Sequence, residues 1–346
     1  MSTGATDALV AAIKRLAQHD SLSGDAIGAA FDVVMAGNAS PVQVAALLMA
    51  LRVKGERPEE VAGVARALRR AMIALPTDDA SALVDTCGTG GGSVSTFNIS
   101  TAAALLAAGA GVRIAKHGNR SFTSRSGSAD VLEALGVKID LTPAAMATVL
   151  REAGIVFMFA PLMHPAMKHV GPVRRELGVP TVMNIVGPLA NPARAGRQVV
   201  GVAEAHRVEL IAGALAELES VHALVVHGAP GMDEISPIGP TTVVELRAGE
   251  APTRWTIDPA WAGEAGAEAS HLDGGSPEEN AALVEAVLHG TGAPGARAAV
   301  VLNAAAAIYI SGAVPDFRTG VARARAALTE GAGAAALERL RRATNA

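Results

Sequence analysis

A glycine-rich segment of the sequence has the residue types that hold a phosphate group. It reads Gly88-Thr89-Gly90-Gly91-Gly92-Ser93 and lies between a predicted strand at 84–86 and a predicted helix at 98–108. Glycines let the backbone approach an anion, and the N–H groups of such a loop and of the next helix can bind phosphate oxygens. The segment matches neither a P-loop nor the dinucleotide fingerprint. Small polar side chains downstream favour phosphate binding over a flexible turn, which is the alternative: Ser95, Thr96, Asn98, Ser100 and Thr101.

A second segment of the same character follows the predicted strand at 112–115. It reads Lys116-His117-Gly118-Asn119-Arg120-Ser121, with further hydroxyls, glycine and a cation at 123–128. Cations and hydroxyls at this density suit a phosphate ligand. A solvated basic loop is the alternative, but glycine and serine separate the charges here, whereas acidic residues usually do so on a solvated face.

Two adjacent carboxylates, Asp233 and Glu234, follow the predicted strand at 224–227. Mg²⁺ takes one or two carboxylates together with water and substrate phosphates, so the pair is a candidate magnesium site. Taken alone, an ordinary acidic turn explains these residues equally well. However, ligands of open parallel sheets gather at the carboxyl ends of the strands, and all three segments follow strands. Together they favour a doubly phosphorylated substrate bound with Mg²⁺.

Other polar residues carry weaker signals. Arg174 could bind a carboxylate through its planar guanidinium, although pairing with Glu176 on a helix surface is the alternative. Cys87 adjoins the glycine segment and is interpreted as a small buried residue rather than a reactive thiol. His164 and His169 stand five residues apart without a further ligand nearby, so we expect no zinc site.

The elements that must position these residues divide the chain near Pro76. Before it, apolar residues recur at helical spacing, and Ser40-Pro41 is typical of a helix start. After it, short apolar runs alternate with alanine-rich helical stretches, which predicts an α/β domain with a largely parallel sheet. We expect strands at 84–86, 112–115, 155–159, 199–202, 224–227, 242–246 and 299–302. The polar region 248–274 is expected to be a surface loop.

Composition excludes several classes of protein. The chain has 346 residues, a size typical of about two domains. Its net charge of −4 argues against a grip on nucleic acid or an acidic membrane. The longest apolar run, 102–112, contains two glycines and is too short to cross a bilayer. No targeting signal is expected, because Asp7 and Lys14 interrupt the N-terminus. We expect a cytoplasmic protein.

The quoted segments closely resemble the anthranilate phosphoribosyltransferases, enzymes of tryptophan biosynthesis. The resemblance spans nearly the whole chain and rests on residues 88–91, 96–101, 116–121, 126–133, 172–178, 184–192 and 233–236. It implies an α/β protein with a small all-helical domain and a larger α/β domain, whose central sheet is mostly parallel, as in nucleoside phosphorylases. The expected domains are 1–75, joined by helices from about 165–181, and 76–346. The resemblance also implies a homodimer.

The activity that the resemblance implies is transfer of phosphoribose from phosphoribosyl pyrophosphate to the amino group of anthranilate, with Mg²⁺. Its expected anthranilate ligands are Gly88, Asn119 and Arg174, and its expected metal ligands are Ser100, Asp233 and Glu234. The expected phosphoribosyl pyrophosphate-binding residues are Gly88, Gly91, Gly92, Thr96, Asn98, Ile99, Ser100, Thr101, Lys116, His117, Gly118, Asn119, Arg120, Ser121, Phe122, Thr123, Ser124 and Ser128. An aryl amine is already neutral at pH 7, so no catalytic acid or base is assigned.

Two positions depart from the family pattern. Gly92 stands where the family usually has Asp, and Pro180 stands where Arg is common. The missing carboxylate bears on magnesium dependence and on affinity for the donor substrate, while the reaction class stays the same. A simpler interpretation of Gly92 is that it gives the turn a positive φ.

Two alternative functions stay open at this point. One is a pyrimidine nucleoside phosphorylase of the same fold, which would need no acidic metal pair. The other is a non-catalytic paralogue that binds nucleic acid or a ligand. Asp233 and Glu234 count against the first, and the net charge together with the intact segment 116–121 counts against the second.

Overall fold

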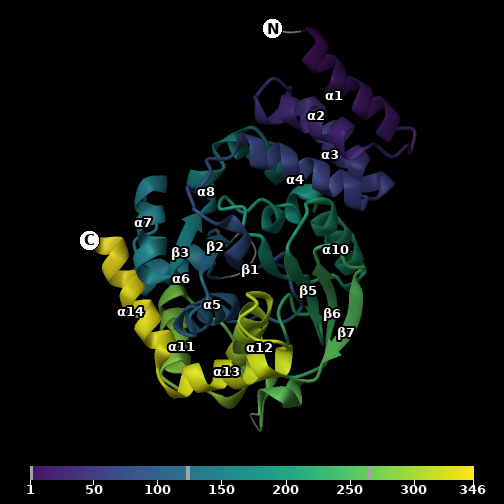
Figure 1. Cartoon of the computed structure of the whole chain (residues 1–346). Helices are drawn as coiled ribbons and strands as arrows, with labels where there is room; N and C mark the ends of the chain where they lie inside the picture. The colour runs from purple at the N-terminus through teal and green to yellow at the C-terminus, as the bar shows by residue number, and fades with distance from the viewer. Residues whose placement is uncertain (1–2, 122–124, 264–265) are drawn as a thin grey trace.

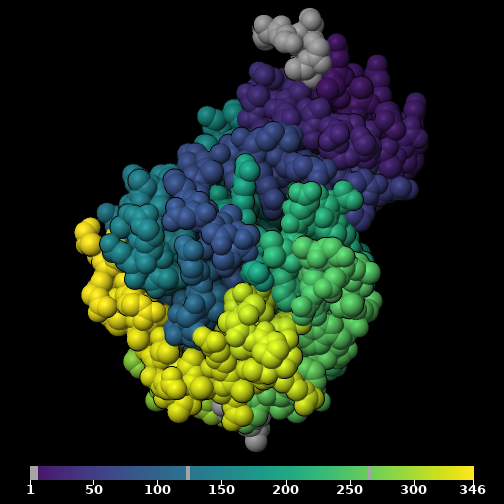
Figure 2. Space-filling view, in the orientation of Figure 1, coloured from purple at the N-terminus to yellow at the C-terminus, as the bar shows by residue number. Residues whose placement is uncertain are grey.

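The computed structural model describes residues 3–121, 125–263 and 266–346. Four helices begin the chain: α1 (Thr3–Leu16), α2 (Gly24–Met35), α3 (Pro41–Lys54) and α4 (Pro58–Ala71). Ser40 caps α3 as predicted, because its hydroxyl accepts the Gln43 N–H while the Gln43 side chain accepts the Ser40 N–H. These helices form a lobe at one end of the molecule (Figures 1 and 2).

A seven-stranded sheet forms the centre of the larger part, with strand order β3-β2-β1-β4-β5-β6-β7. The strands are β1 (Val84–Gly88), β2 (Ile114–Gly118), β3 (Ile155–Phe159), β4 (Arg197–Gly201), β5 (His222–Gly228), β6 (Thr241–Arg247) and β7 (Thr253–Ile257). Neighbours from β3 to β5 are parallel, and β6 and β7 are antiparallel. The predicted class, a helical part joined to an α/β part with a mostly parallel sheet, is confirmed.

One strand prediction and one loop prediction are wrong. Residues 299–302 lie inside the helix α12 (Pro294–Ile310), because a short apolar run fits a buried helix as well as a buried strand. The expected loop at 248–274 contains β7, an edge strand whose side chains are mostly exposed, so its sequence is polar.

The remaining helices cover the sheet or connect its strands. They are α5 (Ile99–Gly109), α6 (Ser128–Ala134), α7 (Pro143–Ala153), α8 (Ala160–Met163), α9 (Gly171–Leu177), α10 (Val208–Glu217), α11 (Pro277–Leu288), α13 (Phe317–Thr329) and α14 (Ala332–Asn345). Short 3-10 helices are η1 (Ala80–Ala82), η2 (Pro165–His169), η3 (Val182–Asn184), η4 (Gly187–Leu189), η5 (Ala205–Arg207), η6 (Pro259–Ala262) and η7 (Ala269–Leu272). Figure 1 shows α5, α11, α12 and α13 gathered at the end opposite the N-terminal lobe. In the described part of the chain, no helix combines the length and the apolar character needed to cross a membrane.

Two apolar clusters lie against the two faces of the sheet. Alternate strand residues point to opposite faces, so Val199 and Leu224 join the cluster with α5 and α12, whereas Val200 and Val225 join the other. That second cluster also contains the apolar side chains of α1–α4 and of residues 170–190. Since it spans the helical lobe and one sheet face, the division of the chain at residue 75 stays a prediction.

Candidate functional site

The acidic segment lies across the carboxyl ends of the central strands. Four parallel strands end in glycine, at positions 88, 118, 201 and 228. A Cβ on Gly88 would stand 2.4 Å from Asp233 Oδ2, one on Gly201 would stand 1.7 Å from the Asp233 carbonyl oxygen, and one on Gly228 would stand 2.4 Å from that of Glu234. Only glycine leaves room for this approach, so the ends of β1, β4 and β5 form the floor beneath the carboxylates.

The glycine segment after β1 is attached to the same acidic segment. The Gly90 N–H donates to Asp233 Oδ2 at 2.8 Å, and the Ser93 N–H donates to the Gly231 carbonyl at 2.9 Å. Gly90 and Gly91 have φ of 71° and 81°, whereas Gly92 lies outside the positive range. The turn therefore requires glycine at positions 90 and 91, and the interpretation of Gly92 as the residue with positive φ is wrong.

Lys116 reaches this floor from the end of β2. Lys116 is only 3% exposed, and its side-chain nitrogen donates to the Thr86 carbonyl at 2.5 Å and to Ser100 Oγ at 3.1 Å. Burial lowers the pKa of Lys116, and the charge of the buried Asp85 opposes that shift. Asp85 is in turn held by the Asn191 amide at 2.7 Å. The structure thus places the Lys116 amine directly beside the N-terminus of α5.

The negative charges of Asp233 and Glu234 are not balanced by the positive charge near them. Burial and the charge of Asp233 together raise the pKa of Glu234 to about 8, even though Lys116 and the Ser100 N–H favour its ionised form. Burial also raises the pKa of Asp233. Two crowded carboxylates beside a hydroxyl are an oxygen donor set that a divalent cation would neutralise, so Asp233, Glu234 and Ser100 fit Mg²⁺. No larger His, Cys, Asp or Glu group of metal-binding type occurs among the residues that the structure describes.

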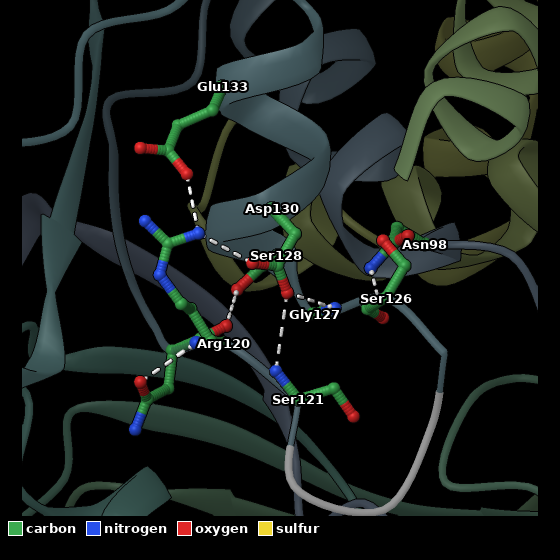
Figure 3. A network of polar contacts seen from close by, with 9 residues as sticks. Asn98, Arg120, Ser121, Ser126, Gly127, Ser128, Asp130 and Glu133 are labelled. Carbon is green, nitrogen blue, oxygen red and sulfur yellow. Dashed lines mark hydrogen bonds and ion pairs between the residues drawn. The ribbon is translucent and has the colours of Figure 1, made fainter. Parts of the chain in front are cut away.

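Asp130, near the start of α6, holds the described residues on both sides of positions 122–124 in the second predicted loop (Figure 3). One Asp130 oxygen accepts from the Gly127 and Ser121 N–H groups, at 2.9 and 3.4 Å, and the other accepts from Arg120 at 2.6 Å. Arg120 also pairs with Glu133 at 2.5 Å. The Arg120 guanidinium is therefore already engaged by two carboxylates, and its assignment to a phosphate stays a prediction.

Asn98 connects the two loops. Its amide donates to the Ser126 carbonyl at 3.4 Å, and its Oδ1 accepts from Asn280 at 2.9 Å (Figure 3 shows the first contact). Near it, the Ile99 side chain and the Thr101 hydroxyl are buried, and Oγ1 of Thr101 has no hydrogen-bond partner in the described structure. The side chain of Ile99 therefore faces the core, so only its backbone could meet a ligand.

The second loop also brings Asn119 close to Ser128 and His117 close to His164. Ser128 Oγ donates to the Asn119 carbonyl at 3.3 Å, and the two histidine rings lie 5.0 Å apart. Burial, with a smaller contribution from His164, lowers the pKa of His117 to about 3, so this ring is neutral at pH 7.

Phe122, Thr123 and Ser124 lie outside the described residues. Gly118 ends β2, and Thr96 lies half-buried just before Asn98.

Arg174 lies half-buried on α9, where burial lowers the pKa of its guanidinium. Within the described ranges its side chain makes no ion pair with Glu176 and no hydrogen bond or ion pair with the two loops. The ligand-binding roles of Arg174 and of the other predicted site residues stay predictions.

Sequence reasoning missed four buried residues that support the site. Asp85 and Asn191 hold the strand ends beneath Lys116, while Asn280 and Asn303 reach the site from α11 and α12. For Asn303 the available signal was a single asparagine inside an otherwise apolar helical run, since buried amides require partners. Asn280 follows two glutamates and carries no such signal. Cys87 is only partly buried and packs against the second apolar cluster, so its interpretation as a buried residue holds in part. Burial raises the pKa of its thiol well above the usual range, which agrees with a thiol that is not reactive.

Comparison with known families gives the class of this protein. Residues 80–334 match the family described as "Glycosyl transferase family, a/b domain", and residues 10–72 match "Glycosyl transferase family, helical bundle domain". The fold and both matches define a glycosyl transferase that combines a helical bundle with an α/β domain.

Individual relatives narrow this class. The chain is 51% identical to the anthranilate phosphoribosyltransferase of Thermomicrobium roseum over 92% of this chain and 91% of the relative. The crystal structure of anthranilate phosphoribosyltransferase from Thermus thermophilus has a TM-score of 0.91 and 43% identity, covering 97% of this chain and 99% of that one. The Saccharomyces cerevisiae enzyme in complex with PRPP and Mg has a TM-score of 0.88 and 28% identity, with coverage of 97% and 98%. The chain belongs to the anthranilate phosphoribosyltransferase family. This membership favours the phosphoribosyltransferase interpretation of the sequence over a nucleoside phosphorylase or a non-catalytic paralogue.

Proposed function

We propose that this chain transfers the phosphoribosyl group of 5-phosphoribosyl 1-pyrophosphate to the amino group of anthranilate. The products are N-(5-phosphoribosyl)anthranilate and pyrophosphate, in tryptophan biosynthesis. The observation that carries the proposal is the acidic segment Asp233–Glu234 lying across the strand ends with the glycine loop hydrogen-bonded to it, in a chain of this family.

The chain's own residues suit displacement of pyrophosphate from the ribose C1. Negative charge builds on the departing pyrophosphate, and Lys116 together with the N–H groups of the glycine loop would stabilise it. Mg²⁺, held by Asp233, Glu234 and Ser100, would add neutralising charge to the diphosphate. Asn119, Gly88 and Arg174 would orient anthranilate, whose neutral amine attacks without a strong base. Positioning therefore supplies most of the rate enhancement.

The proposal extends to assembly and location. Val42 and Val53, both on α3, are 77% and 67% exposed, and apolar residues on the helical lobe suit contact with a second copy of this chain. We therefore propose a homodimer joined through this lobe. A cytoplasmic location stays a prediction of the sequence.

The test is a direct assay. The purified protein is mixed with anthranilate, phosphoribosyl pyrophosphate and Mg²⁺, and the loss of anthranilate fluorescence is followed. Omission of the donor, and addition of a chelator, serve as controls. We expect anthranilate to be consumed only when both phosphoribosyl pyrophosphate and Mg²⁺ are available. Phosphorolysis of uridine or thymidine, with no consumption of anthranilate, would overturn the proposal.

A further inference from the structure

One polar side chain stands in the middle of the buried helix α12. Asn303 is 4% exposed and is flanked by apolar residues on both sides. Burying a primary amide is costly unless its donors and acceptor are paired. Each is paired here: Nδ2 donates to the carbonyls of Ile235 and Ala299, both at 2.9 Å, and Oδ1 accepts from the Ile235 N–H at 3.0 Å.

The contact with Ile235 is reciprocal, like a pair of hydrogen bonds between two strands. Ile235 directly follows Glu234 in a connection between β5 and β6 that has no regular secondary structure. Its backbone N–H and carbonyl are buried and would otherwise need a strand neighbour. The Asn303 amide supplies both partners and therefore fixes the backbone one residue beyond the acidic pair.

A small cavity connects Asn303 with the carboxylate itself. It measures about 10 Å³, roughly the space of one water molecule, and Asn303, Glu234, Ser100, Thr86 and Cys87 are among its lining residues. The Asn303 side chain is therefore linked to the acidic pair in two ways. It is hydrogen-bonded to the backbone of Ile235, the residue after Glu234, and it lines the same small cavity as Glu234.

We infer that Asn303 is a positioning residue that holds Asp233 and Glu234 in the geometry required to bind magnesium with phosphoribosyl pyrophosphate. The inference rests on the proposed function. The proposed role of Asn303 is indirect: it restrains the peptide that carries the candidate metal ligands through its two hydrogen bonds with Ile235. Loss of a group that supports a metal ligand typically lowers metal affinity about 10- to 100-fold.

Asn280 on α11 offers a matched comparison. It is 2% exposed, its Nδ2 donates to Asn98 Oδ1 at 2.9 Å, and its Oδ1 accepts from the Gly275 N–H at 2.7 Å. It is therefore a similarly buried asparagine whose amide both donates and accepts a hydrogen bond, but it supports the loop junction at Asn98 instead of the acidic pair. A third variant, Val301→Ala, removes only apolar contacts from α12, where Val301 is 1% exposed.

The test compares Asn303→Leu, Asn280→Leu and Val301→Ala with the unaltered protein. Calorimetry measures phosphoribosyl pyrophosphate binding over a range of Mg²⁺ concentrations without anthranilate, so no turnover is needed. For Asn303→Leu we expect the Mg²⁺ concentration for half-maximal binding to rise about 10-fold or more. For Asn280→Leu we expect weaker donor binding with that Mg²⁺ concentration unchanged. The melting temperature of each variant is also measured, so that variants of equal stability can be compared.

The inference is overturned if Asn303→Leu shifts the Mg²⁺ profile no more than a Val301→Ala variant that loses as much thermal stability. Should Asn303→Leu fail to fold, Asn303→Ser gives the same comparison with a smaller polar side chain. The unaltered protein separates the two ideas: absence of Mg²⁺-dependent donor binding there contradicts the proposed function, whereas normal binding with unaltered variant profiles contradicts only the role of Asn303.

Discussion

Asp233 Oδ2 accepts a hydrogen bond at 2.8 Å from the backbone N–H of Gly90, a residue 143 positions earlier in the chain. The bond joins a loop after β1 to the connection after β5, and both lie at the carboxyl ends of their strands. Ligand binding at this edge is the general behaviour of open parallel sheets. Here the geometry also places the candidate phosphate-binding loop and the candidate metal ligands in direct contact.

Removal of the acidic pair should abolish magnesium-dependent turnover. In an Asp233→Ala/Glu234→Ala double variant, we expect the rate to fall at least about 100-fold, since charge stabilisation of the leaving group is lost. The measurement is the anthranilate fluorescence assay with a magnesium titration, and circular dichroism controls for folding. A folded double variant with an unchanged magnesium titration would contradict the metal assignment.

Arg174→Ala should weaken anthranilate binding selectively. A charged hydrogen bond to a carboxylate is worth about 1.5–3 kcal/mol, so we expect the KM for anthranilate to rise at least about tenfold. The KM for phosphoribosyl pyrophosphate should change little. Steady-state kinetics with each substrate varied in turn measures the split, and Arg175→Ala on the same helix is the control. An effect on donor KM alone would show that the role is wrong.

Gly92→Asp should alter the magnesium dependence of the rate. A Cβ at this position would stand 3.0 Å from the Gly231 carbonyl oxygen and 3.4 Å from Asp233 Oδ1, so a carboxylate there adds negative charge beside the acidic pair. Cation affinity rises with ligand charge, and we expect the half-saturating Mg²⁺ concentration to fall about threefold or more. The anthranilate KM should move little. An identical magnesium profile accompanied only by a lower melting temperature would count against this prediction.

Glu245→Gln should reduce stability in a pH-dependent way. Burial opposes ionisation of this carboxylate, but hydrogen bonds from His222, Tyr309 and Arg247 outweigh it and lower its pKa from 4.5 to about 2. The stabilisation is therefore complete above pH 4.5 and is lost as pH falls towards 2. We expect the variant to melt about 2–5 °C lower at pH 7. The difference between the two melting temperatures should shrink below pH 4.5, and a constant difference would refute the assignment.

The sequence predicted those parts of the fold and site whose signals are local. Glycine-rich turns after apolar strands, capped helices and runs of cations with hydroxyls each follow from a few neighbouring residues. The run at 299–302 shows where this fails: it is four apolar residues long, and only the surrounding 17-residue helix identifies it. The prediction at the edge strand β7 fails for a different reason: most of its side chains are exposed, so its sequence is polar like that of a loop.

Residues that support the site from a distance could not be assigned from the sequence. Asn280 and Asn303 act through Asn98 and Ile235, which are 182 and 68 residues away along the chain. A lone asparagine carries no information about such a remote partner. Contacts of this kind depend on how helices pack behind the sheet, which no local pattern records.

The position of β1 between β2 and β4 has a consequence for folding during synthesis. β2 is made soon after β1, but β4 and the acidic segment belong to the second half of the chain, and α12 follows later still. The edge of β1 that pairs with β4 therefore has no strand partner until the ribosome has synthesised β4. A nascent chain should gain protection of β1 from proteases in two separate steps, and donor binding should appear only with the second.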